Sequence, residues 1–443
     1  MKKCIPLLVV LPLVSACSML PSWLGGADKP IKRLPGTREE VMTNDQLYTV
    51  DEKTKSMAYK LPAATANGEW EQHSGQFTAA TSNLSLTGDL SDEHRTSIGD
   101  GDEFPQTTTP APVVAAGKIF AMDGTGHISA HDLILLNHKV WTSEALVDKD
   151  EKEVLGGGLA AQDDKLYAVS GLGIAAAINI GTGETVWTRD LGIPLRSAPR
   201  VKNGVMVVTS IESQTFALDI ATGKTLWTHR GISEMAGLLN TVSPTFAGGM
   251  VIVPYASGEL YALKLDTGEE AWRTSLSQTR KTSANVIFSG VAGDPVVDDA
   301  VVFAISSGGA FSVFNIINGQ PLWEKPISSI NTPWVSGDYV FVVSEENTLI
   351  AMLKYDGSIR WTKQLTSYHD EKRKLYPIVW RGPVLVNDKL ALVSSAGEMI
   401  LVDAATGDTS KTIDVPNDVS AAPIVADGKI YLVNKAAELV ELK

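Results

Sequence analysis

The chain has 443 residues, of which 44% are hydrophobic and 20% charged, so it is long and apolar enough to bury a large core. Its 51 Asp and Glu outnumber its 38 Lys and Arg, and the formal net charge is −13 at pH 7. An acidic surface of this kind repels nucleic-acid phosphates, which excludes DNA and RNA as expected partners. The two cysteines, Cys4 and Cys17, lie near the N-terminus, so no disulfide can form in the rest of the chain.

Residues 1–16 have the pattern of an export signal, with a basic start and an apolar stretch at 5–14 that is too short to span a bilayer as a helix. The sequence Val-Ser-Ala-Cys at 14–17 resembles a bacterial lipobox, in which cleavage precedes the cysteine and the cysteine is then acylated. We therefore expect a lipoprotein signal peptide over 1–16 and lipidation at Cys17. An ordinary secretory signal with a chance cysteine is the alternative. Ser18 follows in place of Asp, which by analogy with that class directs the protein to the outer membrane.

Residues 17–45 follow the signal and are rich in Pro, Gly and charged residues, without hydrophobic periodicity. Such a composition is typical of a flexible linker. We expect this segment to carry the lipidated Cys17 and to act as a tether. The folded domain is then expected to occupy residues 46–443.

A motif recurs along this domain about every forty to fifty residues, as strand, Gly-marked turn, strand, turn and Trp. A repeat of that length built from four short strands is typical of a propeller blade. The copies end at Trp141, Trp187, Trp227, Trp272, Trp323, Trp361 and Lys411. We expect these six Trp side chains, and Trp70 near the start of the domain, to pack between blades, with ligand stacking as the alternative.

Eight copies of the first half of the motif predict an all-β fold, an eight-bladed β-propeller of four-stranded antiparallel blades. No segment of the domain predicts a convincing helix. The eighth copy, over 422–441, lacks a Gly turn and a last strand. The segment 67–70, which ends in Trp70, has a comparable pattern, so we expect an N-terminal strand there to complete the last blade and close the ring.

The Gly-x-x-x-Trp blade ending is similar to the repeat of quinoprotein dehydrogenases, eight-bladed propellers that bind pyrroloquinoline quinone (PQQ) and calcium. The chain also resembles the BamB family of outer-membrane assembly lipoproteins, which use the same blade without the cofactor. The lipobox at Cys17, the tether, the opening Asn-Gly-Glu-Trp-Glu-Gln-His-Ser-Gly at 67–75 and the eight blades carry this second resemblance. It covers nearly the whole chain.

The BamB resemblance implies partners and a contact loop. BamB proteins bind BamA, the barrel that inserts outer-membrane proteins, through its POTRA domains, using a Leu-x-Leu-Arg stretch before a blade. Here Ile193, Leu195 and Arg196 occupy that place, with Ile193 for the first Leu. We expect these side chains to be exposed and to bind BamA, with a plain connecting loop as the alternative. The acids that the family uses near the next blade are missing from 239–244.

Candidate ligand-binding residues are sparse. Asp294, Asp298 and Asp299 form the best acidic cluster for calcium, although Asp is also common in turns. Among the histidines, His127 and His131 are close enough in sequence to share a strand face, but zinc needs three or four converging ligands. Catalytic nucleophile motifs, phosphate loops and paired cysteines are absent from the sequence. We expect no catalytic residues, no metal and no cofactor.

The combined features predict a non-enzymatic scaffold that is lipid-anchored to the periplasmic face of the outer membrane. As the resemblance implies, it binds BamA within the β-barrel assembly complex and assists insertion of β-barrel proteins, with nascent outer-membrane proteins as further partners. Two alternatives remain open from the sequence. One is a periplasmic PQQ-dependent quinoprotein oxidoreductase, and the other is a lipoprotein that binds carbohydrate on a propeller face.

Overall fold

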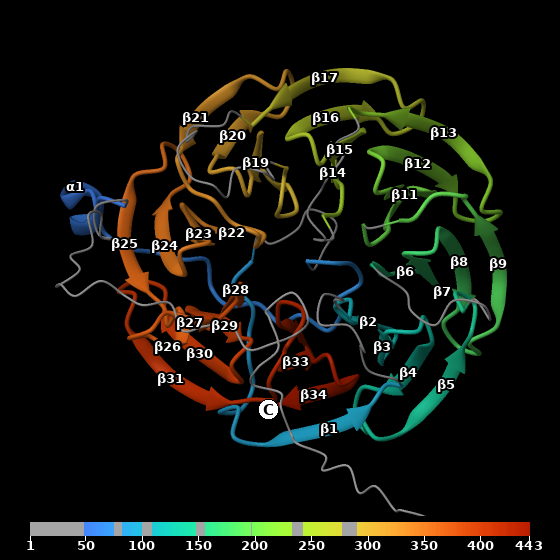
Figure 1. The fold of residues 1–443 in the computed structure, drawn as a ribbon, viewed down its shortest axis with the longest axis horizontal. Helices are drawn as coiled ribbons and strands as arrows, with labels where there is room; N and C mark the ends of the chain where they lie inside the picture. Colours follow the sequence, from blue (N-terminus) through green and yellow to red (C-terminus); the bar gives the residue numbers. More distant parts are fainter. Residues whose placement is uncertain are drawn as a thin grey trace, which may run out of the picture. The chain divides into compact units, whose positions relative to one another are not determined.

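Eight four-stranded antiparallel sheets surround a common axis in a computed structural model of the chain (Figure 1). The structure describes residues 48–74, 82–99, 109–147, 156–195, 197–232, 242–276 and 290–443. The chain divides into two compact units, Met1–Leu47 and Tyr48–Lys443, and all described residues belong to the second. The predicted all-β, eight-bladed propeller is confirmed. The predicted boundaries at residues 16 and 45 lie outside the described residues.

Blades 1 to 4 follow one another along the chain, and the strands of each blade are hydrogen-bonded in sequence order. The strands are β2 (Val113–Ala115), β3 (Lys118–Met122), β4 (Ile128–Asp132), β5 (Lys139–Ser143); β6 (Gly157–Gln162), β7 (Lys165–Ser170), β8 (Ile174–Asn179), β9 (Thr185–Asp190); β10 (Arg200–Lys202), β11 (Val205–Thr209), β12 (Gln214–Asp219), β13 (Thr225–Arg230); and β14 (Thr245–Ala247), β15 (Met250–Pro254), β16 (Glu259–Lys264), β17 (Glu270–Ser275).

Blades 5 to 7 repeat this order, and blade 8 combines three C-terminal strands with β1. The strands are β18 (Val296–Asp298), β19 (Val301–Ile305), β20 (Phe311–Asn315), β21 (Pro321–Lys325); β22 (Trp334–Ser336), β23 (Tyr339–Val343), β24 (Thr348–Leu353), β25 (Ile359–Gln364); β28 (Trp380–Val386), β29 (Lys389–Ser394), β30 (Glu398–Asp403), β31 (Thr409–Asp414); and β32 (Ile424–Ala426), β33 (Lys429–Val433), β34 (Glu438–Leu442), β1 (Glu93–Ser97). A hairpin of β26 (Tyr368–Asp370) and β27 (Leu375–Pro377) lies between blades 6 and 7.

Burial within a blade falls from the axis to the rim. In blade 3, all five residues of β11 are buried, whereas in β13 only Trp227 is buried. The inner strands are apolar on both faces because each face packs on a neighbouring blade, so hydrophobic clusters span adjacent blades. The outermost strand of each blade is exposed to water at the rim of the ring and therefore carries more polar residues.

The Trp repeat joins each of blades 1 to 6 to the blade that follows it. The Trp227 indole N–H donates to the Leu265 carbonyl oxygen of the following blade at 2.9 Å, and its ring lies so close to Gly268 that an added Cβ would sit 2.6 Å away. Gly268 also has φ +72°, which favours glycine. Equivalent indole hydrogen bonds join the other blades, from Trp141, Trp187, Trp272, Trp323 and Trp361. Inter-blade packing is thus confirmed for six of the seven predicted Trp residues.

The seventh Trp prediction and the predicted closing strand are wrong. β1, not the segment 67–70, pairs with β34 and completes blade 8. His94 of β1 faces Glu441, in the place where other blades pair Trp with a small residue such as Ala262. Trp70 instead forms a bridge with Val114 of the innermost strand of blade 1 and is buried. An N-terminal strand does close the ring, but it comes from a later segment.

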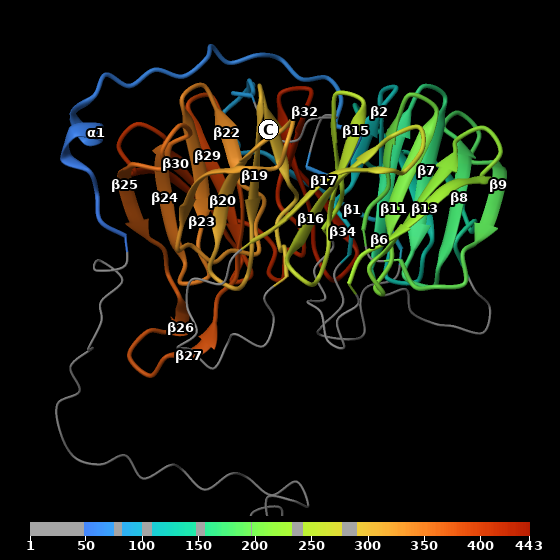
Figure 2. The same cartoon turned by 90° about the horizontal axis from the view of Figure 1, so that it is seen from above.

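Residues 48–74 and 82–92 form a strap that crosses one side of the ring and enters its centre (Figures 1 and 2). The strap begins at α1 (Glu52–Ser56), a five-residue helix that the sequence did not predict. Hydrogen bonds then join the strap to several blades, from Arg360 to the Thr54 carbonyl, from Asn67 to Val425 and from Gln72 to Val201. Blades far apart in the chain therefore share one bound segment. No helix of the described residues is long and apolar enough to cross a membrane.

Candidate functional site

The first strand of blades 1 to 7 begins, and the last strand of every blade ends, on one side of the ring, called here the loop side. A blade with four antiparallel strands returns the chain to the side where it started, so each of blades 1 to 7 begins and ends there. The hairpin β26–β27 projects from this side, and the strap crosses the opposite side (Figure 2). The predicted partner-binding residues Ile193, Leu195 and Arg196 belong to the β9–β10 connection on the loop side.

The expectation that Leu195 is exposed is wrong. Leu195 is 0% exposed and packs in the core between blades 2 and 3, while its backbone forms a bridge with Ser210. Val291 and Val419 make the same kind of bridge before their own blades and are also buried. All three lie four residues before a proline, so a repeat signal existed in the sequence. Ile193 is partly buried against the same cluster, and Arg196 lies outside the described residues.

Two other isoleucines beside this connection are exposed. Ile211 is 39% exposed, and its backbone N–H donates to the Pro194 carbonyl at 3.0 Å. Ile232 is 58% exposed, next to Gly231, whose N–H bonds to the turn after Ile211. We call Ile193, Ile211 and Ile232 the isoleucine patch. It presents apolar side chains on the loop side of blade 3, where Leu195 fixes the backbone of the connection from inside.

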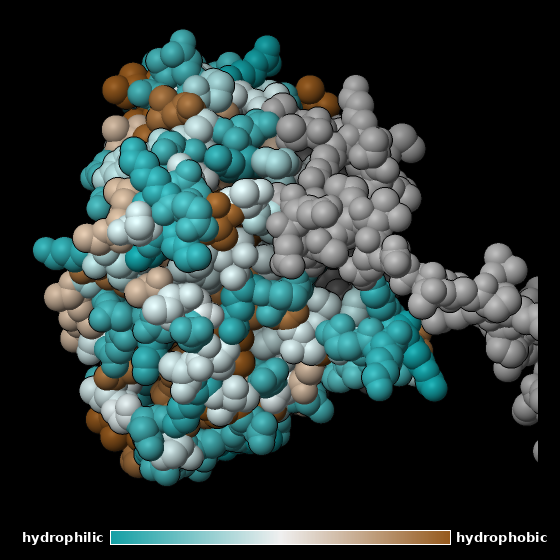
Figure 3. Space-filling model, turned by 90° about the vertical axis from the view of Figure 1, so that its left-hand side faces the viewer, coloured by the Kyte–Doolittle hydropathy of each residue, from teal (hydrophilic) through white to brown (hydrophobic). Residues whose placement is uncertain are grey.

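The part of the rim shown in Figure 3 has no continuous hydrophobic surface. The side with α1 and β25 is mainly hydrophilic, and its hydrophobic residues are scattered (Figure 3). Single exposed hydrophobic residues are normal on soluble surfaces. A protein partner is therefore better accommodated by the loop side than by this part of the rim.

The acidic residues considered for calcium are already bound by cations of the protein. The Asp294 carboxylate accepts from Arg200 at 3.0 Å, from Ser74 at 2.8 Å and from the Ser243 N–H at 2.7 Å, and it lies 2.8 Å from His73. Burial alone would raise the pKa of Asp294, but His73, Arg200 and the Ser243 N–H hold it below its usual value.

Asp298 and Asp299 do not join Asp294 in one site. Lys354 lies 2.6 Å from the Asp298 carboxylate and 3.6 Å from that of Asp299. Among the described residues, no three His, Cys, Asp or Glu side chains lie together in a way that could hold a metal ion. The predicted acidic cluster thus separates into two ion-paired sites, one at the axis and one in blade 5.

The histidines also make structural contacts. His131 is buried in β4, where its ring nitrogens lie 3.0 Å from the Leu136 carbonyl and 3.2 Å from the Ser129 hydroxyl. Burial lowers the pKa of His131, which favours the neutral ring. The His127 ring lies 2.7 Å from the Thr125 hydroxyl in the preceding turn. Within the described residues, His127 and His131 do not belong to a group of side chains that could bind a metal ion together.

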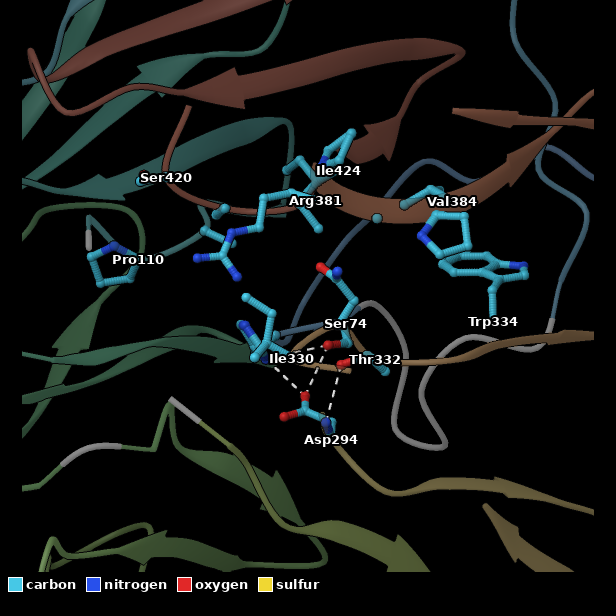
Figure 4. Close-up of a pocket in the computed structure, with 18 of the residues that line it drawn as sticks. Ser74, Pro110, Asp294, Ile330, Thr332, Trp334, Arg381, Val384, Ser420 and Ile424 are labelled. Carbon is cyan, nitrogen blue, oxygen red and sulfur yellow. Dashed lines mark hydrogen bonds and ion pairs between the residues drawn. The ribbon is translucent and has the colours of Figure 1, made fainter. Parts of the chain in front are cut away.

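A cavity of about 840 Å³, counting the space at its mouth, lies at the centre of the ring. Its walls include Pro110, Ile330 and Val384 from the starts of three blades, together with Ser74 of the strap (Figure 4). Arg381 of β28 extends its side chain into this cavity (Figure 4). Arg381 was not among the residues predicted from the sequence, although it lies two residues before a blade-opening proline, much as Asp294 directly precedes Pro295.

The repeated sequence of the blades matches the model of a known protein family. The family model described as outer membrane protein assembly factor BamB matches residues 136–363 and 366–443, from the start of β5 to the end of β34. The chain belongs to this family. Its match covers the Trp–Gly interlocks and the β9–β10 connection that carries Ile193 and Leu195.

Relatives agree with this assignment. The outer membrane protein assembly factor BamB of Yersinia pestis is 24% identical over 346 residues, which cover 76% of this chain and 84% of the relative. The protein of the same description from Shewanella oneidensis is 25% identical over 353 residues, covering 77% and 86% of the two chains.

Solved structures show the same fold. BamB from Moraxella catarrhalis has a TM-score of 0.65 and 17% identity, and the match covers 79% of this chain and all of that one. A quinohemoprotein alcohol dehydrogenase from Comamonas testosteroni has a TM-score of 0.66 and 13% identity, covering 86% and 81%. At these identities the likeness concerns the fold alone, so the fold does not separate scaffold from dehydrogenase.

Proposed function

We propose that the chain is a non-enzymatic scaffold of outer-membrane protein assembly, which binds BamA within the β-barrel assembly complex and assists insertion of β-barrel proteins. The observation that carries the proposal is the family match over residues 136–363 and 366–443. A second observation favours it over the quinoprotein alternative, because the acids that were candidates for calcium are engaged by Arg200 and Lys354.

The proposed contact surface for BamA is the loop side of blade 3. The isoleucine patch provides apolar anchors, and Arg196 lies in the same connection. Interfaces are often held by a few apolar and Arg side chains, with nearly neutral contacts around them. Leu195 is 0% exposed, so we assign it a supporting role in this surface, in which its buried side chain positions the connection.

A double variant tests this surface. Ile232→Asp with Arg196→Ala should weaken co-purification with BamA from intact envelopes at least tenfold, as expected for loss of about 1.4 kcal/mol or more from an interface, and Ile232 is 58% exposed, so the fold should tolerate the charge. The matched control is Ile134→Asp, because Ile134 is 81% exposed in the β4–β5 turn on the opposite side of the ring. Undiminished co-purification of the folded double variant would place the interface elsewhere.

Leu195→Ala is unsuitable as an interface test. Removing a fully buried leucine costs about 2–5 kcal/mol of folding stability, so lost binding would not report on contact. The quinoprotein alternative has its own test, in which the purified protein is mixed with PQQ and calcium. A quinone absorbance that remains bound through gel filtration, with turnover of an alcohol, would contradict the scaffold proposal.

We also propose that the protein is anchored at the periplasmic face of the outer membrane by acylation at Cys17. More than one acyl chain gives stable anchoring, since each buried CH₂ contributes about 0.8 kcal/mol. Cys17→Ala should leave an unprocessed precursor that is lost from the outer-membrane fraction. Mass spectrometry of the mature N-terminus and membrane fractionation provide the measurements. Normal maturation of Cys17→Ala with continued outer-membrane association would refute the anchor.

A further inference from the structure

Arg381 is a charged side chain in an otherwise largely uncharged wall of the central cavity. It lies in β28, is partly exposed, and extends into the space between Pro110 and Ile330 (Figure 4). No carboxylate or other hydrogen-bond partner among the described residues is in contact with its guanidinium. Burial of the surrounding site lowers the pKa of Arg381, which reflects an environment that disfavours its charge.

Two buried arginines of the propeller, one near the axis and one on the rim strand β25, do have partners. Arg200 donates to Asp294 at 3.0 Å and to the Pro244 carbonyl at 3.0 Å. Arg360 donates to the carbonyl oxygens of Thr54 and Met57, each at 3.0 Å. The absence of such contacts at Arg381 is therefore specific to that position among these three.

The cavity's own carboxylate does not neutralise Arg381. Asp294 also lines the cavity, but its oxygens already accept from Arg200, Ser74 and the Ser243 N–H. Arg200 offsets the negative charge of Asp294, so no carboxylate of the described residues compensates the positive charge of Arg381. A charge without a partner is unfavourable in a partly desolvated site, and an anion that enters the cavity would relieve this cost.

We propose that the central cavity binds a small carboxylate with a compact apolar body, with Arg381 as its anchor. A guanidinium donates two parallel N–H bonds to a carboxylate, and this planar geometry matches one Arg to one carboxylate. Pro110, Ile330, Val384 and Ile424 provide apolar walls for the rest of such a molecule. A phosphate dianion fits less well, because the described walls offer it one cation and little further charge.

The proposal is independent of BamA binding, because the cavity lies at the axis and the isoleucine patch lies at blade 3. Carboxylate binding by the cavity can therefore be refuted without affecting the proposed BamA interface, and the reverse is also true. It also concerns binding alone, since no reaction is assigned to the cavity.

Benzoate is the probe for the first experiment, and benzamide and inorganic phosphate are the matched controls at equal ionic strength. Benzoate should raise the melting temperature of the full mature chain and bind in equilibrium dialysis, whereas benzamide and phosphate should do neither. Arg381→Met should abolish the benzoate effect, and Arg381→Lys should weaken binding by about tenfold. Arg230→Gln, at an exposed rim position, should bind as the unaltered protein does.

Stability without ligand separates a binding role from a structural one. Arg381→Met should fold at least as stably as the unaltered protein in the absence of benzoate, because it removes an unpaired desolvated charge. Equal benzoate binding by Arg381→Met would overturn the proposal, as would no benzoate binding by the unaltered protein. If Arg381→Met and Arg381→Lys are both strongly destabilised without ligand, the side chain has a structural role and the proposal is wrong.

Discussion

Removal of residues 18–99 should prevent stable folding of the propeller. This truncation deletes the strap and β1, so blade 8 keeps three strands and exposes the edge of β34. An exposed edge pairs with other chains and leads to aggregation. The same truncation removes the buried side chains of Trp70 and Gln72 from the centre of the ring.

Two shorter truncations separate the contributions. Removal of 18–45 should leave the melting temperature nearly unchanged, because these residues precede the compact unit Tyr48–Lys443. Removal of 18–88 deletes the strap and keeps β1, so it should give an intermediate loss of stability without the same tendency to aggregate. Calorimetry and light scattering of chains exported with a cleavable signal give both readouts. Equal stability of all three truncations would show that neither strap nor β1 supports the ring.

Asp294→Asn should lower the free energy of unfolding by about 3–5 kcal/mol, the usual cost of breaking a buried ion pair by removing one partner. Both Arg200 and Asp294 are almost fully buried, and their charged atoms lie 3.0 Å apart. The substitution leaves Arg200 as an uncompensated cation inside the protein. Urea unfolding followed by tryptophan fluorescence measures the loss.

The double variant Arg200→Met with Asp294→Asn is the decisive control. It removes both charges, so it should recover most of the stability lost in Asp294→Asn. The Asn oxygen at residue 294 can still accept from the Ser243 N–H, while its amide nitrogen takes the place of the carboxylate oxygen that faced Ser74 and can donate to the Ser74 hydroxyl. If the double variant is as unstable as the two single variants added together, the pair does not interact as the geometry indicates.

The repeated parts of the fold could be predicted because their causes are local. A glycine with positive φ in a tight turn and a Trp four residues later recur in blades 2 to 6, as at Gly268 and Trp272. The period of the motif then determines the four-stranded blade. The six interlocking Trp residues were predictable for this reason, since each contacts the turn of the next copy.

The places where the prediction failed are those where the repeat is broken. Trp70 has the sequence pattern of a blade ending, but it lies on the innermost strand of blade 1 and not on a rim. β1 carries no Trp, so its pairing with β34 had no local signal. The family resemblance implied that Leu195 is exposed, but its repeat position, shared with Val291 and Val419, is a buried one.

The sequence by itself determined the eight-bladed ring, since hydrophobic periodicity, glycine turns and Trp spacing act within one blade or between consecutive blades. Only the tertiary structure decided which segment completes blade 8, how the strap enters the centre, and which charged residues meet there. Arg200 and Asp294 are 94 residues apart, and Asp294 and His73 are 221 apart. Such contacts depend on closure of the whole ring, and no short-range pattern encodes the distance between side chains that closure brings together.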